Sequence, residues 1–367
     1  MSENFVLQNV RLLDGDSVDI KVENQRIAEI VPAGKGHGDK KVDFGHGVYA
    51  SSGWIDLHTH AFPEFIPYGD EADEIGYKTG VTTIVDAGST GADRLPDLIH
   101  LSEESKTKVL AFLNISRIGL QRIDELSDLS LLEEDKLKES AAAYKDYIVG
   151  LKARISKSVV GTNGIEPLRM ARRFSKDTGL PLMVHIGSGP PDINEVLELL
   201  EENDVLTHYL NGKANNLFDE SGKPLPKFLE AIDRGVQLDV GHGNASFSFR
   251  TAEQARNAGI RFNTISTDIY RKNRLNGPVY SMASVLSKFL YLGYSLKEVI
   301  DAVTINPAKW LKRPELGRVA IGDAANLTFF TVENKKTTFR DSEGEERTAD
   351  QTIVVKGVVI NGEYIEC

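Results

Sequence analysis

Cysteine and long apolar runs are nearly absent from this sequence of 367 residues, and each absence excludes a class of protein. The single cysteine, Cys367, is the last residue, so an internal disulfide and a thiolate metal cluster are both excluded. No apolar run approaches the roughly 20 residues that cross a bilayer, and the first residues show no basic segment followed by an apolar one. We therefore expect a cytoplasmic protein without a membrane partner.

Positive charge is also scarce. The chain has 43 Lys and Arg against 54 Asp and Glu, a formal net charge of −11. This balance disfavours binding to nucleic acid or to an anionic membrane surface. Hydrophobic residues make up 41% and charged residues 26%, as in ordinary globular proteins, and the length suffices for one large core with a smaller satellite domain.

Both ends of the chain have the character of short strands with tight turns. Apolar and polar residues alternate in Phe5–Leu13, Val18–Val22 and Arg26–Val31, and again in Thr352–Ile360 near the other end. We predict that residues 1–52 and 317–367 join into one small β-sandwich domain.

The middle of the chain, residues 53–316, alternates short apolar runs with amphipathic stretches. Such alternation indicates βα units and a parallel sheet. Eight units match a (β/α)₈ TIM barrel, whose usual size is about 250 residues, and an open doubly wound sheet is the alternative. The expected strands are Trp54–His58, Val81–Asp86, Val109–Ile115, Ile148–Arg154, Pro181–His185, Val205–His208, Val236–Val240 and Phe262–Thr267. The clearest helical patterns are Ile165–Thr178, Asn194–Glu202, Lys227–Arg234 and Thr251–Ala258.

Four of the eight histidines close expected strands. His58 and His60 end the first strand, where residues i and i+2 share a face, and His185 and His208 end the fifth and sixth. A single histidine in such a place is more often a hydrogen-bonded rim residue. Because barrel enzymes place their chemistry at the carboxyl ends of the strands, four together predict a metal site.

Asp268 and Lys152 extend this set. Asp268 follows the eighth expected strand, where it is either a helix N-cap or a metal ligand and general base. Lys152 lies inside an apolar strand, where burial lowers an amine pKa. It either forms an interior ion pair or reacts, as a neutral amine, with carbon dioxide to give a carbamate that can bridge two cations.

Five further residues are candidates for contact with a substrate. Arg154 shares a face with Lys152, and its guanidinium either grips a substrate carboxylate or pairs with a barrel acid. His242 and Gly243 end the seventh strand, where His242 either contacts the substrate carbonyl or sits in a plain turn. Tyr270 and Asn211 lie near expected ligands and are predicted to line the pocket.

Taken together, the pattern resembles the two-metal amidohydrolase superfamily. It consists of His58-x-His60, Lys152, His185, His208 and Asp268 on strands one, four, five, six and eight, with Gly53-Trp54-Ile55-Asp56-Leu57 before the first pair. The resemblance covers nearly the whole chain. It implies two divalent metal ions, usually zinc, bridged by a carboxylated Lys152, with His58, His60 and Asp268 on one ion and His185 and His208 on the other.

Within that superfamily the chain resembles a small subgroup of bacterial deacetylases that are often mislabelled dihydroorotase or adenine deaminase. Dihydroorotases usually carry an arginine just after His-x-His, where Ala61 stands here, and Lys152 argues against an adenine deaminase. The usual D-aminoacylases use a cysteine ligand. The resemblance implies removal of an acetyl group from α-hydroxy acids or D-amino acids. The alternatives are a dihydroorotase-like cyclic amide hydrolase and, remotely, a metal-free interaction scaffold. A homo-oligomer is the usual expectation.

Overall fold

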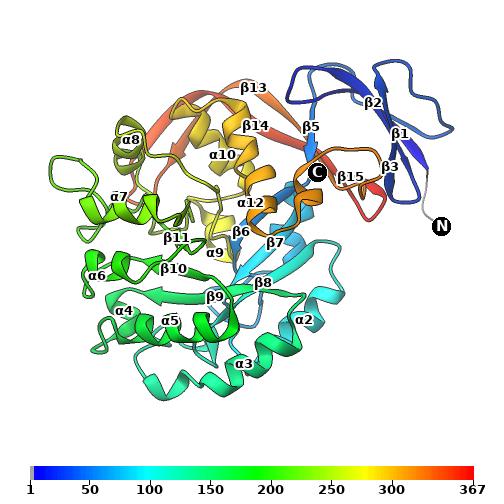
Figure 1. The fold of residues 1–367 in the computed structure, drawn as a ribbon. Helices are drawn as coiled ribbons and strands as arrows, with labels where there is room; N and C mark the ends of the chain where they lie inside the picture. Colours follow the sequence, from blue (N-terminus) through cyan, green and yellow to red (C-terminus); the bar gives the residue numbers. More distant parts are fainter. Residues whose placement is uncertain (1–3) are drawn as a thin grey trace.

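A computed structural model describes residues 4–367 and contains two sheets (Figure 1). The first sheet has seven parallel strands whose order in space follows their order in the sequence. This succession curls the sheet into a barrel, as the sequence predicts. The strands are β6 (Trp54–Thr59), β7 (Val81–Ala87), β8 (Lys108–Asn114), β9 (Ile148–Ile155), β10 (Leu182–Ile186), β11 (Val205–Thr207) and β12 (Gln237–Asp239).

The eighth expected strand, Phe262–Thr267, is not a regular strand. It is an extended segment that forms a parallel bridge from Thr264 to Asp239 on one side. Just beyond it, Ile269 forms a second parallel bridge to Thr59 of the first barrel strand. The segment therefore closes the barrel although its ladder is interrupted, and the (β/α)₈ architecture is confirmed.

Helices cover the outside of the barrel between successive strands (Figure 1). The four helical patterns of the sequence correspond to helices α5 to α8, with ends shifted by a few residues. The helices are α1 (Ala72–Ile75), α2 (Leu95–Glu103), α3 (Glu134–Ala143), α4 (Lys157–Val160), α5 (Glu166–Thr178), α6 (Ile193–Glu198), α7 (Pro226–Asp233), α8 (Phe249–Asn257), α9 (Arg271–Asn276), α10 (Met282–Tyr291), α11 (Leu296–Asp301) and α12 (Ile305–Trp310). Short 3₁₀ turns are η1 (Tyr77–Thr79), η2 (Gly119–Gln121), η3 (Leu129–Leu131) and η4 (Pro314–Gly317). No described helix is long and apolar enough to span a bilayer.

Strands from both chain ends form the second sheet, as expected. They share one continuous hydrogen-bonded sheet, rather than two separate ones, in the order β15-β14-β13-β5-β1-β2-β3, with β4 beside β1. A separate apolar core includes Leu7, Ile20 and Phe329. The exact domain boundaries stay a prediction. The strands are β1 (Phe5–Arg11), β2 (Ser17–Glu23), β3 (Arg26–Pro32), β4 (Lys41–Asp43), β5 (Tyr49–Ser52), β13 (Leu327–Arg340), β14 (Glu346–Ile360) and β15 (Glu363–Glu366).

The hairpin of β13 and β14 connects this sheet to the barrel. Its long arms run from β5 toward α8 and α10 (Figure 1). Near the tip, Asp341 accepts a hydrogen bond from the Phe249 amide at the start of α8 (3.0 Å). Farther from the tip, the Ile353 amide donates to Ser287 in α10 (2.9 Å). This hairpin therefore reaches the end of the barrel where the strands β6 to β12 finish.

Candidate active site

Five of the six predicted metal ligands lie at the carboxyl ends of the barrel strands. His58 and His60 end β6, His185 lies in β10, His208 follows β11, and Asp268 follows the closing segment. His58, His60 and His208 are almost completely buried. The parallel strands thus bring five residues that are far apart in the sequence to one end of the barrel, as the pattern of strand-terminal histidines predicts.

Asp268 lies at the centre of three of these histidines. Its Oδ1 is 3.2 Å from His60 Nε2 and 3.5 Å from His58 Nε2, and its Oδ2 is 4.0 Å from His208 Nε2. One ligand atom each from His58, His60 and Asp268 lies within 4.8 Å of the others, a spacing that suits a single metal ion. Two imidazoles and a carboxylate are ordinary ligands for zinc and similar divalent ions.

His185 and His208 form a second pair beside this triad. His185 Nδ1 and His208 Nε2 are 2.8 Å apart, and the two rings meet edge to face. Because His208 also lies near Asp268, the pair and the triad are neighbours. The geometry is therefore compatible with two adjacent ions, one held by each group.

Lys152 lies beside the first group and is completely buried. Its Nζ is 3.2 Å from His58 Nε2 and 3.4 Å from Met183 Sδ, and no carboxylate of residues 4–367 lies within ion-pair distance of it. The interior ion pair that the sequence left open is thus absent from the described contacts. Burial lowers the pKa of Lys152 to about 7, so a large fraction of the amine is neutral near physiological pH. An unpaired, readily neutralised amine facing metal-ligating side chains fits the carbamate.

Burial also lowers the pKa of His58, His185 and His208 well below the ordinary value. These imidazoles are therefore neutral, the state in which a ring nitrogen coordinates a metal. The donor set fits divalent cations in charge as well as in position.

Neighbouring hydroxyl groups orient the first two imidazoles. His58 Nδ1 lies 3.0 Å from Thr207 Oγ1, which donates to Asp239 at 2.7 Å. His60 Nδ1 lies 2.8 Å from Ser89 Oγ. Each ring thus has its Nδ1 side occupied and its Nε2 directed toward Asp268, as is usual for metal-ligating histidines.

Two of the ligands have an unusual backbone conformation. His208 has φ 69° and Asp268 has φ 50°, in the left-handed region that non-glycine residues rarely adopt. Such strain persists where the surrounding structure imposes it, commonly at functional sites. Here the His208 ring is held at 2.5 Å by the Gly241 carbonyl oxygen, and the Asp268 amide donates to the His58 carbonyl at 2.7 Å.

Arg154 lies beside the cluster and is held on two sides. Its Nη1 is 3.4 Å from a carboxylate oxygen of Glu125, which is completely buried, and its guanidinium lies 5.5 Å from the centre of the Tyr68 ring. The barrel-acid partner that the sequence left open therefore exists. Because Glu125 contacts only one nitrogen, the guanidinium keeps further donors for a ligand.

The His242 ring is turned into the protein. Its Nε2 accepts a hydrogen bond from Lys288 Nζ at 2.7 Å, so Nδ1 carries the proton and donates to the Gly243 carbonyl at 2.8 Å. The ring stacks on Phe247 and has no exposed surface. Both nitrogens are occupied, so this geometry gives His242 a role in building the turn in place of the substrate contact that the sequence predicts.

The other three predicted substrate residues also have defined surroundings. Gly243 passes so close to Asp268 that a Cβ there would lie 2.5 Å from its Oδ2. The Tyr270 hydroxyl donates to Asn244 at 2.8 Å, and its ring lies beside that of His60. Asn211 is buried and donates to the His208 carbonyl at 2.9 Å, which makes it a loop-building residue.

Comparison with known proteins agrees with this arrangement. The model of the amidohydrolase family matches residues 49–365, which includes every metal-ligand candidate. The chain belongs to the amidohydrolase family. It is a hydrolytic enzyme built on that family's barrel, and the cluster at the strand ends is its candidate metal centre.

Similar amidohydrolases carry several names. A deacetylase of Enterococcus faecalis is 40% identical over 368 residues, covering all of both chains, and a deacetylase of Brucella anthropi is 36% identical over 89% of this chain and 82% of its own. The crystal structure of an adenine deaminase has a TM-score of 0.95 at 39% identity, over 99% of this chain and 100% of that one. The crystal structure of a dihydroorotase has a TM-score of 0.92 at 32% identity, over 99% of this chain and 98% of that one.

Several residues of this amidohydrolase site were not predicted from the sequence. Glu125, Ser89, Thr207 and Asp239 contact the predicted residues without being metal ligands themselves. The available signal is a hydroxyl or carboxylate inside an otherwise apolar strand, as at Thr207 and Asp239. Glu125 lies in a long connection between strands, where no such signal exists.

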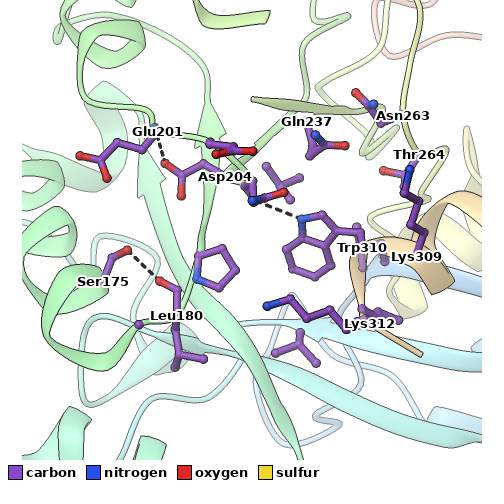
Figure 2. Close-up of a pocket in the computed structure, with 18 of the residues that line it drawn as sticks. Ser175, Leu180, Glu201, Asp204, Gln237, Asn263, Thr264, Lys309, Trp310 and Lys312 are labelled. Carbon is purple, nitrogen blue, oxygen red and sulfur yellow. Dashed lines mark hydrogen bonds between the residues drawn. The ribbon is translucent and has the colours of Figure 1, made fainter. Parts of the chain in front are cut away.

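A cavity of about 750 Å³ lies at the opposite end of this amidohydrolase's barrel (Figure 2). It is lined by residues where strands begin, such as Val149, Val205 and Gln237, and by α12, where the Trp310 indole donates to the Asn203 carbonyl. Catalytic chemistry in such barrels belongs to the other end. The cavity is therefore separate from the candidate metal centre.

Proposed function

We propose that this chain is a metal-dependent deacetylase that acts on a small carboxylate-bearing substrate, an acetylated α-hydroxy acid or an N-acetyl-D-amino acid. The observation that carries the proposal is the convergence of six metal-ligand side chains with a guanidinium, Arg154, beside them. End-to-end similarity to a deacetylase of Enterococcus faecalis supports the same reaction.

His58, His60 and Asp268 would hold one divalent ion, and His185 and His208 would hold the other, with carboxylated Lys152 between them. The chemistry of these ligands favours zinc in both positions. When bound, two such ions polarise a carbonyl group and supply a nucleophile at neutral pH. A carbamate on Lys152 supplies two oxygens with negative charge where an ammonium would repel both ions.

Asp268 is the proposed general base. Its carboxylate lies at the centre of the cluster, and contacts with His58, His60 and His208 outweigh the effect of burial and lower its pKa below the ordinary value. It would take a proton from the water that attacks the acyl carbon and return it to the leaving oxygen or nitrogen. Acetate and the free hydroxy or amino acid are then the products.

Arg154 is the proposed grip for the substrate carboxylate. Replacement by methionine removes the charge and keeps most of the length, so Arg154→Met should raise KM about 10-fold or more for carboxylate substrates. A neutral ester analogue should be affected far less. Equal losses on both substrates would remove the carboxylate grip from the proposal.

A dihydroorotase-like hydrolysis of a cyclic amide is the second candidate, which similarity to a solved structure titled as a dihydroorotase supports. The deciding experiment assays zinc-loaded protein against an acetylated α-hydroxy acid, an N-acetyl-D-amino acid and dihydroorotate, with metal content measured alongside. Turnover of an acetylated acid with about two metals per chain supports the deacetylase. Turnover of dihydroorotate alone retains the metal centre and replaces the substrate.

A further inference from the structure

Lys213 lies in the loop after β11, five residues beyond the metal-ligand candidate His208. The loop fixes its backbone at both ends. Asn211 Oδ1 accepts a hydrogen bond from the Lys213 amide at 3.0 Å, and the Asn211 side-chain amide donates to the His208 carbonyl. The Asn216 side chain donates a hydrogen bond to the Lys213 carbonyl at 2.7 Å. The position of Lys213 relative to His208 is therefore set by short side-chain bridges.

The Lys213 ammonium group lies beside the backbone that follows β10. Its Nζ lies 3.3 Å from where a Cβ would stand on Gly187, two residues after His185. The charge of Lys213 acts on His185, and Lys213 in turn is influenced by Asp268 and Arg154. Because the same Cβ would lie 2.9 Å from Ser156 Oγ, the ammonium lies near Gly187 and Ser156, which are each two residues beyond His185 and Arg154.

The two cations differ in how far their charge is already neutralised. Arg154 has the buried Glu125 carboxylate at 3.4 Å, whereas no carboxylate of residues 4–367 lies within ion-pair distance of Lys213 Nζ. Lys213 is half-buried, and burial lowers its pKa. An ammonium group partly removed from water without a counter-charge is costly, so a ligand that supplies a negative charge there gains more than at a paired cation.

We propose that Lys213 is a substrate-binding residue which, with Arg154, holds the substrate carboxylate from two sides. Arg154 approaches from β9 and Lys213 from the β11 loop, so the carboxylate is fixed at the mouth while the acyl group extends toward the metal-ligand cluster. The inference rests on the proposed function only in that the substrate carries a carboxylate. Both the acetylated acids and dihydroorotate meet this condition.

The test compares Lys213→Met and Lys213→Arg with Lys223→Met, a matched control at an exposed lysine farther along the same loop. Each protein is assayed on the substrate that the wild type hydrolyses best and on the carboxamide analogue of that substrate. Lys213→Met should raise KM for the carboxylate about 10-fold or more with a small change in kcat. It should change the carboxamide by less than about two-fold, and Lys213→Arg should restore most of the loss.

The outcomes separate the two proposals. A wild type that hydrolyses dihydroorotate only, with KM raised by Lys213→Met, overturns the deacetylase and retains the role of Lys213. A wild type that hydrolyses acetylated acids, with equal losses on carboxylate and carboxamide in Lys213→Met, retains the deacetylase and overturns the role of Lys213. A wild type that hydrolyses only neutral substrates overturns both.

Discussion

Among single residues, Asp268 is held by the largest number of structural constraints. Its backbone has φ 50°, its carboxylate is the nearest anion to three histidines, and Gly243 packs directly against it. A helix N-cap, the simpler role open from sequence, requires none of these features. The structure therefore favours a functional Asp268, and the strain at its backbone is compensated by the hydrogen bonds on either side.

Asp268→Asn preserves the size of the side chain and removes its basicity. We expect kcat to fall about 10³-fold, within the range attributed to a general base, while bound metal stays near the wild-type level because four histidines and Lys152 remain. Steady-state kinetics with metal analysis of the same preparation measures both. Substantial residual activity in the metal-loaded variant would contradict the role of Asp268 as base.

Lys152 gives a pH-dependent prediction. Its pKa is lowered from 10.5 to about 7, so the neutral amine that carbon dioxide requires becomes abundant as the pH rises through 7 rather than through 10. Metal-free protein given zinc, with dissolved carbon dioxide held at one concentration at every pH, should therefore regain activity faster at pH 8 than at pH 6. The rate should reach a plateau above about pH 8. A rate that keeps rising tenfold per unit up to pH 10 would mean an ordinary lysine.

At the scale of elements, the site depends on turns that follow regular strands. Strand ends carry a strong sequence signal, which explains why His58, His185 and His208 were predictable from an apolar run closed by histidine. The orientation of His242 was not predictable, because it depends on Lys288 from α10, which no local pattern connects to the seventh strand. The position of Lys213 beside Gly187 was not predictable either, because no local pattern connects the β11 loop to the end of β10.

The turn after β12 can be tested at Gly243. Gly243→Ala introduces two effects, a side chain at φ 53° and a Cβ within 2.5 Å of Asp268 Oδ2. We expect kcat to fall about 10- to 100-fold, because displacement of a catalytic group by a fraction of an ångström is costly. The matched control is Gly259→Ala, where φ is 75° but nothing lies within 4 Å of the added Cβ. Similar kinetics for the two variants would show that contact with Asp268 is unimportant.

At the scale of the whole molecule, the candidate metal centre takes its ligands from several strands around the barrel. The ligands come from β6, β9, β10, β11 and the closing segment, whose ladder is interrupted. Ions bound there would hold the closing segment against β6 and so stabilise the part of the barrel where the strand ladder is interrupted. A cytoplasmic location and a homo-oligomeric state stay predictions.

Removal of metal should therefore destabilise the fold as well as abolish activity. A ligand present at about 1,000 times its Kd contributes roughly 4 kcal/mol to the free energy of unfolding, which corresponds to a fall in Tm of about 5 °C in a chain of this size. Thermal unfolding before and after dialysis against a chelator measures the change, and added zinc should reverse it. An unchanged Tm with full loss of metal would show that the barrel closes without help from ions.

The hairpin of β13 and β14 has a consequence for synthesis of the chain. Strand β5 pairs with β13, so Ala50 cannot pair until Phe329 has been made. The Phe249 amide at the start of α8 likewise cannot donate to Asp341 until the hairpin tip has been made. A ribosome releases these partners only after all the barrel strands have been made. The N-terminal strands thus emerge long before they can be completed, and contacts of such long sequence separation form slowly. The barrel strands are thus synthesised before the hairpin that completes the second sheet and braces the rim of the active site.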